Sequence, residues 1–433
     1  MEQTRRQQVV RSLRAAAGGL GLLLLIAAVV GPHWSRNLAV EPEDRFVAGV
    51  LGFLFAAMSV LGPRFRNAYA ATAVILLNSL VLLLAVELVV RSADRLREGP
   101  PDPAVKNAVL NALPFQQRHN VEFAEVAKLQ FEPYGLWRNL PYSGRTIRVA
   151  ETGLRETPGS RCTPDAYKIF AFGGSAMWGA GAADAETIPA FLQGLLANAN
   201  RPVCVRNYAQ IGYVFGQNIA ELVNLLLQGE KPDLVISYDG YNDVYVAYEQ
   251  GLAHRQFYYA DMKRMYQPIE QHWYYNLAIY WRIHPAPPET YQWHDYTTMG
   301  KDADALSTEV ANHYLNSYAV VDALAARWHF DFVLFVQPTI SMGKKRLTKA
   351  ELPVLADLSE PLKRLTAGIY ERLEASAKER RRLFYLADVF DEADGEIWFD
   401  PVHVSGNGNK IVAERIASVL ALEGIYPVQG RIK

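Results

Sequence analysis

Cysteine is scarce in this chain, which has 433 residues and only two cysteines, Cys162 and Cys204. A fold held by many disulfides is therefore excluded. The two cysteines lie just before the first predicted strand and within the second, which should be neighbours. They leave two alternatives open, one disulfide in an oxidising compartment or two reduced thiols.

An excess of charge of one sign is also missing, because 44 basic residues balance 45 acidic ones. This balance gives no support for nucleic-acid binding. The sequence further lacks internal repeats, low-complexity tracts and any His, Cys and Asp cluster with the spacing of metal ligands. We therefore expect neither a repeat architecture nor a metal site, and no pattern in the sequence calls for a cofactor.

Long apolar runs occur only within the first hundred residues. Three of them, at about 15–31, 46–62 and 70–90, approach the roughly 17–25 residues with which a helix crosses a bilayer. We predict a three-helix transmembrane anchor over residues 1–91. A cleaved signal peptide is the alternative for the first run, because arginines precede it. No small-residue cleavage site follows that run, however, and Trp34 suits an interfacial anchor.

Arginine placement predicts the orientation of this anchor. Arginines concentrate in the N-terminal tail and in the connector at residues 63–66, whereas the connector between the first two runs carries more acid than base. By the positive-inside rule the N-terminus lies inside and the large C-terminal part outside. Arg91, Arg95 and Arg97 count against this orientation. We expect a multi-pass protein of the inner membrane with its large domain on the periplasmic side.

Beyond the anchor the chain divides into a connector at residues 92–165 and a larger domain at residues 166–433. The connector is polar and contains prolines, but residues 136–155 have the pattern of a short hairpin packed on the larger domain. An aromatic-rich insertion at about residues 245–305 is long for a connection. It could line a sugar-binding cleft, lie against the membrane, or form a cap with its own small core.

Short apolar runs alternate with amphipathic stretches in the larger domain. This alternation predicts an α/β fold with a parallel sheet covered by helices on both faces. A last helix is expected from Ser405, its predicted N-cap, to Leu422. The predicted strands are residues 167–172, 203–208, 234–238, 330–336 and 382–389, and the other predicted helices are 187–199, 218–228, 308–328 and 361–378.

Two loops carry groups suited to acyl chemistry. Asp400 precedes His403 by three residues, close enough to accept the Nδ1 proton and leave Nε2 as a base. Ser175 follows the first strand, where Gly173 and Gly174 allow a tight turn that a Cβ would obstruct. In open α/β sheets the reactive site forms beyond the carboxyl ends of the strands, where this turn lies.

The order of these segments resembles that of the SGNH (GDSL-like) hydrolase superfamily. The resemblance implies a flavodoxin-like three-layer sandwich over roughly residues 145–422 and says nothing about the anchor. Four blocks carry it: residues 172–179, 207–213, 238–243 and 398–410.

The resemblance implies a Ser-His-Asp triad with Ser175 as nucleophile, His403 as base and Asp400 as its orienting partner. The expected function is that of a membrane-anchored, extracytoplasmic serine esterase or acyltransferase that forms an acyl-enzyme. Its expected substrates are acyl esters, above all O-acetyl groups of cell-envelope or secreted polysaccharide. A lipid-ester hydrolase and a catalytically silent glycan-binding or assembly protein are the alternatives.

Acyl transfer also requires donors around the oxyanion. The Ser175 backbone N–H can point at it from the start of a helix. The family pattern implies two more donors, the backbone N–H of Gly212 and the side-chain amide of Asn242. Gly216 competes with Gly212 as a turn glycine, and the match of residues 207–213 to the family block favours Gly212.

Overall fold

A computed structural model of the protein describes residues 66–97, 115–197, 202–259 and 295–426, together with short stretches and single positions between residues 8 and 59. The chain divides into two compact units. One comprises Met1–Pro100 and Lys263–Thr290, and the other comprises Pro101–Met262 and Tyr291–Lys433. The central sheet and every predicted site residue belong to the second unit.

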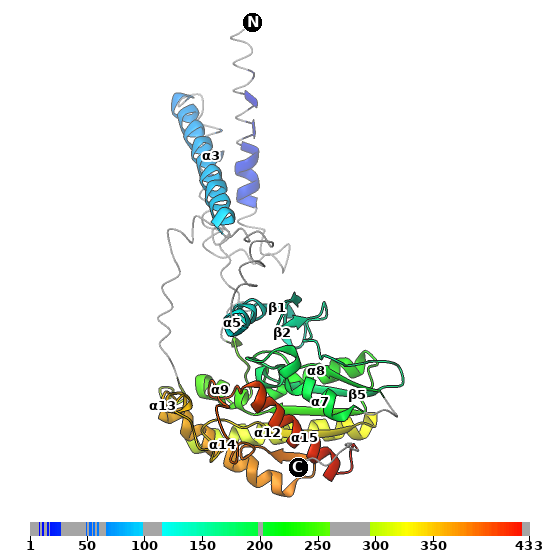
Figure 1. Ribbon diagram of the computed structural model, residues 1–433. Helices are drawn as coiled ribbons and strands as arrows, with labels where there is room; N and C mark the ends of the chain where they lie inside the picture. Colours follow the sequence, from blue (N-terminus) through cyan, green and yellow to red (C-terminus); the bar gives the residue numbers. More distant parts are fainter. Residues whose placement is uncertain are drawn as a thin grey trace. The chain divides into compact units, whose positions relative to one another are not determined.

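A five-stranded parallel sheet with the order β6-β5-β7-β8-β9 forms the centre of the second unit (Figure 1). The predicted parallel sheet is therefore confirmed. The last predicted strand ends early, because the chain turns after Leu386, whose carbonyl accepts the N–H of Val389 at 3.0 Å. The strands are β5 (Tyr167–Gly173), β6 (Val203–Asn207), β7 (Leu234–Asp239), β8 (Asp331–Val336) and β9 (Leu383–Tyr385).

Side-chain caps mark where several helices begin. Thr187, Ser359 and the predicted Ser405 each accept a hydrogen bond from a backbone N–H in the first turn. The described helices of this unit are α5 (Phe115–Val126), α6 (Ser175–Trp178), α7 (Ile188–Leu196), α8 (Phe215–Leu227), α9 (Tyr241–Gln250), α12 (Ala303–Trp328), α13 (Glu351–Ala356), α14 (Glu360–Glu379) and α15 (Gly406–Leu422), with a 3-10 turn η1 at Asp184–Glu186.

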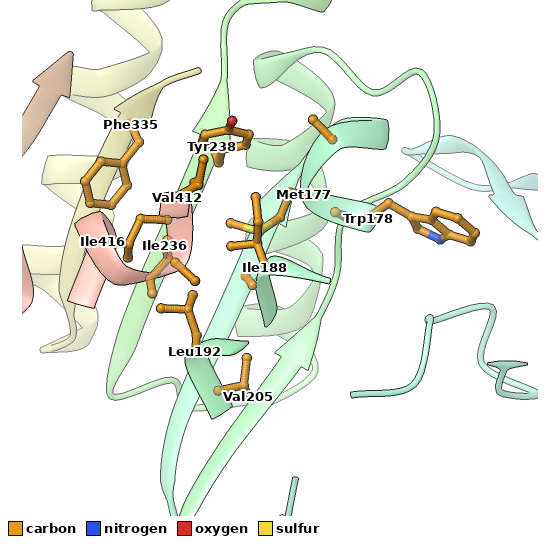
Figure 2. Packing of buried hydrophobic residues seen from close by; sticks show 14 of the residues in the cluster. Met177, Trp178, Ile188, Leu192, Val205, Ile236, Tyr238, Phe335, Val412 and Ile416 are labelled. Atoms are coloured by element: carbon orange, nitrogen blue, oxygen red, sulfur yellow. The ribbon is translucent and has the colours of Figure 1, made fainter. Parts of the chain in front are cut away.

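Helices cover both faces of the sheet because successive strand residues point to opposite sides. In β5, Ile169 and Ala171 join one core together with residues of α7 and α15. Phe170 and Phe172 join the other core with residues of α8, α12 and α14. Figure 2 shows the first core, in which side chains of α7 and α15 pack against strand residues such as Ile236. The three-layer arrangement is therefore confirmed.

Two antiparallel strand pairs precede the sheet. β1 (Leu129–Glu132) pairs with β2 (Leu136–Asn139), and β3 (Tyr142–Ser143) pairs with β4 (Arg148–Val149). The hairpin predicted over residues 136–155 is confirmed for the β3–β4 pair, but its first residues form β2 and pair with the preceding strand β1. Tyr134 and Leu136 adopt φ values of 66° and 74° in that turn. Positive φ at such residues is uncommon, so no residue pattern predicted the turn.

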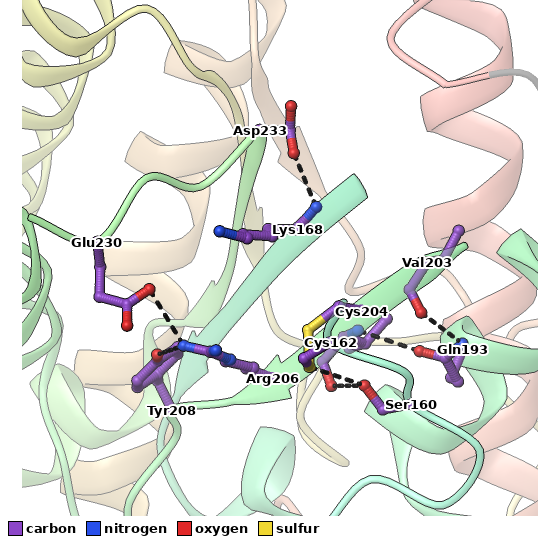
Figure 3. Close-up of a disulfide and its surroundings, with 11 residues drawn as sticks. Ser160, Cys162, Lys168, Gln193, Val203, Cys204, Arg206, Tyr208, Glu230 and Asp233 are labelled. Carbon is purple, nitrogen blue, oxygen red and sulfur yellow. Dashed lines mark hydrogen bonds and ion pairs between the residues drawn. A yellow bond between two sulfur atoms is a disulfide. The ribbon is translucent and has the colours of Figure 1, made fainter. Parts of the chain in front are cut away.

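Cys162 and Cys204 form a disulfide with their Cα atoms 4.8 Å apart (Figure 3). Cys204 lies in β6, the edge strand of the sheet. Two residues before Cys162, the hydroxyl of Ser160 donates to the carbonyl of Val205 at 3.0 Å. The disulfide thus fastens the segment before β5 to the edge strand, and it resolves the two alternatives that the sequence left open.

The first unit contains α3 (Arg66–Arg97), a helix of 32 residues that encloses the third predicted apolar run. The predicted runs at 15–31 and 46–62 lie partly outside the described residues, as does most of the insertion at 245–305. Where the structure describes the chain, it contains no helix that is both long and apolar enough to span a bilayer. The three-helix anchor stays a prediction.

Candidate active site

Four loops bring the predicted site residues to the carboxyl edge of the sheet. Ser175 follows β5 as the first residue of α6, and Gly212 lies between β6 and α8. Asn242 lies in the first turn of α9, directly after β7. Asp400 and His403 occupy the loop before α15. All five residues line one cavity of about 400 Å³.

A continuous hydrogen-bonded chain joins Ser175, His403 and Asp400. The Oγ of Ser175 lies 2.7 Å from Nε2 of His403, and Nδ1 of His403 lies 2.5 Å from Oδ2 of Asp400. Oδ1 of Asp400 accepts the backbone N–H groups of Val402 and His403 at 2.9 and 2.7 Å. Burial alone would raise the pKa of Asp400, but the bonds from His403 and the two backbone groups lower it. An ionised Asp400 holds the Nδ1 proton and leaves Nε2 as the acceptor.

A buried ion pair supports the loop that carries this imidazole. Oε1 of Glu351 accepts the backbone N–H groups of Ile397 and Trp398 at 2.8 and 2.9 Å. Its Oε2 accepts Nζ of Lys345 and the N–H of Thr348, both at 2.8 Å. Burial opposes ionisation of Glu351, yet these four donors lower its pKa to about 2. This support could not be predicted from the sequence, because Glu351 and Lys345 have no spacing that points to the distant loop.

Neighbouring atoms leave no room for a side chain at either of the two glycines before Ser175. A Cβ on Gly173 would lie 2.6 Å from the Cβ of Met177 and 2.6 Å from the carbonyl oxygen of Tyr238. A Cβ on Gly174 would overlap Nδ2 of Asn242. The tight turn predicted from these glycines is confirmed, and the second glycine also makes room for the amide of Asn242.

A buried arginine holds the chain that follows the serine. Arg155 is 1% exposed, and its guanidinium donates to the carbonyls of Gly179 and Ala182, both at 2.6 Å. It also donates to Oδ1 of Asp184 at 2.9 Å and lies over the ring of Trp178, 4.3 Å from the centroid. These contacts tie the end of α6 to the segment before the sheet. The sequence offered no signal for this role.

The three residues expected to donate to the oxyanion all line the same cavity. Ser175 begins α6, and a helix leaves its first N–H groups without intrahelical acceptors. Gly212 has φ 79° in a tight turn that lines the cavity. Nδ2 of Asn242 donates one proton to the carbonyl of Tyr213 at 2.7 Å and carries a second N–H. Gly216 lies within α8, outside the residues that line the cavity.

Aromatic side chains form much of the cavity wall. They are Tyr241 and Tyr245 of α9 and, after that helix, Phe257 and Tyr258. The ring of Tyr245 lies 6.0 Å from that of Tyr241 and 5.9 Å from that of Phe257. The described part of the lining contains no lysine, arginine or glutamate, and Asp400 is its only aspartate. Part of the predicted aromatic insertion therefore borders the site.

Two further carboxyl groups are buried behind the cavity. Burial raises the pKa of Asp239 to about 8 and that of Asp243 to about 7. Asp239 accepts hydrogen bonds from Ser237 and Asn218, and Asp243 accepts the N–H of Phe215 at the start of α8. Neither carboxyl lines the cavity: Asp239 joins α8 to the end of β7, and Asp243 joins α8 to α9. Among the described residues, no group of three or more His, Cys, Asp and Glu could hold a metal.

No family model and no curated protein matches the chain. Among solved structures it is similar to an acetyl xylan esterase, AlAXEase, at 14% identity and a TM-score of 0.33, over 58% of this chain and 99% of that one. It is also similar to a lipolytic protein of the G-D-S-L family from Veillonella parvula DSM 2008, at 14% identity and a TM-score of 0.32, over 59% and 96% of the two chains. A catalytic mutant of Axe2, an acetylxylan esterase from Geobacillus stearothermophilus, matches at 16% identity and a TM-score of 0.35, over 63% and 100%. Similarities at this level do not determine an activity, so the chemistry has to follow from the arrangement of the side chains.

Proposed function

We propose that this chain is a serine esterase or acyltransferase in which Ser175 attacks the carbonyl carbon of an acyl ester. The observation that carries the proposal is the bonded chain from Oγ of Ser175 through His403 to Asp400, open to one cavity. His403 takes the serine proton as the new C–O bond forms. The N–H groups of Ser175, Gly212 and Asn242 stabilise the oxyanion.

Collapse of the tetrahedral intermediate breaks the ester bond. His403 gives its proton to the departing alcohol, and the acyl group stays on Ser175. Water, or a hydroxyl group of a second molecule, then attacks the acyl-enzyme with His403 again as base. The first outcome is hydrolysis and the second is acyl transfer.

For the substrate we propose O-acetyl and related acyl esters of neutral polysaccharide. The cavity of about 400 Å³ falls in the range of small-molecule sites, about 300–1,000 Å³, and leaves room beside an acetyl group for part of its alcohol. Tyrosine rings offer both an apolar face and a hydroxyl, which suits a sugar. The absence of lysine and arginine from the described lining favours an uncharged group.

We also propose that three N-terminal helices anchor the protein in the inner membrane, with the site on the periplasmic side. The apolar runs and the arginine distribution support this topology. The disulfide supports an oxidising compartment. A Cβ on Gly52 would lie 2.9 Å from both the carbonyl oxygen of Gly21 and the N of Leu25, a close backbone approach typical of membrane helix pairs. An alkaline phosphatase fused to the C-terminus should be active, and an active cytoplasmic reporter there would contradict the topology.

Fluorophosphonate labelling of the purified full-length protein tests the chemistry. The wild type should be labelled at Ser175, Ser175→Ala should not, and Ser143→Ala, which removes an exposed hydroxyl, should label normally. Undiminished labelling of Ser175→Ala would refute the assignment. A series of acyl esters then separates the substrates, since a preference for long chains would favour a lipid-ester hydrolase. A wild type that neither labels nor turns over any ester would favour the silent glycan-binding protein.

A further inference from the structure

One residue of the β1–β2 hairpin, Trp137, contacts three successive residues of the loop after β6 through its side chain and its backbone carbonyl. The indole Nε1 of Trp137 donates to the carbonyl of Ile211 at 2.8 Å, and the Trp137 carbonyl accepts the hydroxyl of Tyr213 at 2.7 Å. Between them, a Cβ on Gly212 would lie 3.6 Å from Cζ2 of the indole. Trp137 is 4% exposed, so water has little access to the indole.

The carbonyl of Ile211 and the N–H of Gly212 belong to the same peptide group. In a trans peptide these two groups point in opposite directions, and the described chain contains no cis peptide. Trp137 holds the carbonyl on the hairpin side. The N–H of Gly212 is therefore directed away from the hairpin, and Gly212 lines the cavity that also contains Ser175.

The turn that contains this peptide has an alternative form. The N–H of Tyr213 donates to the carbonyl of Gln210 at 3.2 Å, and Gly212, the third residue of the turn, has φ 79°. This is the pattern of a type II turn. Rotation of the central peptide by half a turn gives a type I turn, which glycine also tolerates. In that form the carbonyl oxygen of Ile211 would face the cavity and repel an oxyanion.

We propose that Trp137 is a positioning residue, whose indole N–H holds the Ile211–Gly212 peptide in the form that stabilises the oxyanion. This inference rests on the proposed function, which makes the N–H of Gly212 a donor. The hydrogen bond to the carbonyl also polarises the peptide and strengthens its N–H as a donor. Trp137 does not line the cavity, so it acts through the peptide rather than on the substrate.

Trp137→Phe tests this role, because it keeps an aromatic ring in place and removes the indole N–H. The kcat for an activated acetyl ester, counted per site titrated with a fluorophosphonate, should fall about 10- to 100-fold. This is less than the roughly 10²–10³ that follows outright loss of a donor. KM should change less than about twofold, since ground-state contacts are untouched. Phe131→Ala is the matched control, since this residue of the same hairpin is 68% exposed and should leave kcat unchanged.

Gly212→Ala provides a second, independent perturbation of the same peptide. Space is available for the methyl group, whose nearest contact would be Phe257 at 3.5 Å, but φ 79° is unfavourable for alanine. This variant should therefore favour the flipped turn and lower kcat at least as much as Trp137→Phe. The double variant should be no worse than Gly212→Ala alone, because both changes act through one peptide.

These measurements separate the inference from the function on which it rests. Unchanged kcat in Trp137→Phe or in Gly212→Ala, within an active enzyme, would overturn the role of Trp137 and leave the esterase intact. If the factor by which kcat falls in the double variant equalled the product of the two single factors, the role of Trp137 would also be overturned, because the two residues would then act independently. A wild type without turnover on any ester would refute the proposed function and this inference with it.

Discussion

Replacing Glu351 with glutamine would turn one oxygen of a buried carboxylate into an N–H donor. Oε1 accepts the backbone N–H groups of Ile397 and Trp398. Oε2 accepts Lys345 and the N–H of Thr348. A glutamine has a single oxygen, so whichever way its amide turns, two of the four donors face its NH₂ group. The substitution therefore removes hydrogen bonds and leaves buried donors without an acceptor, although the side-chain volume hardly changes.

We expect Glu351→Gln to lower the free energy of unfolding by about 3–5 kcal/mol. The side chain of Lys345 is 3% exposed, and a buried charge that loses its partner costs about this much. The pKa of Glu351 gives a second figure. It is lowered from 4.5 to about 2, which corresponds to about 3 kcal/mol. Because the pKa falls on folding, this stabilisation is present above about pH 4.5 and is lost as the pH falls through about 2.

Denaturant unfolding of the wild type and of Glu351→Gln, at neutral pH and at about pH 3, measures the difference in their free energies of unfolding. This difference should be smaller at the acidic pH. Glu360→Gln is the matched control, because the Glu360 side chain is 86% exposed and its pair with Lys363, at 2.9 Å, should contribute less than about 1 kcal/mol. Labelling of Ser175 should also slow in Glu351→Gln, since the loop that presents the imidazole loses its anchor. A loss below about 1 kcal/mol at neutral pH, or one that does not narrow in acid, would refute this reasoning.

Four further predictions concern the site and the disulfide. Asn242→Ala should lower kcat for an activated acetyl ester by about 10²–10³ with little change in KM, and full kcat would make Asn242 only a turn residue. Asp400→Asn should lower kcat by about 10⁴ through the wrong imidazole tautomer. In the wild type the lowered pKa of Asp400 should keep its carboxylate ionised at pH values below the ordinary titration range of an aspartate. An acid limb of the pH–rate profile that lies above that range and shifts when Asp400 is replaced would contradict the assignment. Cys162→Ser removes the disulfide that closes a loop of 42 residues, and it should lower the free energy of unfolding by about 4 kcal/mol. A reductant should lower the free energy of unfolding of the wild type by a similar amount and leave that of the variant unchanged.

The sheet could be predicted because each of its elements leaves a local pattern in the sequence. A strand such as β5 is an apolar run, and Ser405 marks a helix start through its own side chain. Alternation of strands and helices then implies a parallel sheet, whose carboxyl ends share one edge. That rule places the loops after β5, β6 and β7 at one edge, and the four-block resemblance then selects Ser175, Gly212 and Asn242 within them.

The supports of the site could not be predicted, because they join segments that share no local pattern. The bond from Trp137 to Ile211 spans 74 residues, and the bond from Ile397 to Glu351 spans 46. Each pairs a side chain with a backbone group, and a backbone group carries no residue type that a sequence could reveal. The turn before β2 was missed for a related reason, since Tyr134 adopts a positive φ for which only its surroundings account.

Both supports act on peptide groups rather than on the reacting atoms. In the proposed mechanism Trp137 orients a peptide whose N–H serves the oxyanion, and Glu351 accepts two N–H groups where the loop with His403 begins. Hydrogen bonds of this kind transmit orientation without placing further charge in the cavity, which leaves its walls free for a neutral substrate. A reactive geometry tolerates displacements of only about 0.5 Å, so the rate must depend on residues that the substrate never touches. The hairpin before the sheet therefore belongs to the proposed enzyme as much as the strands that precede Ser175 and Asn242.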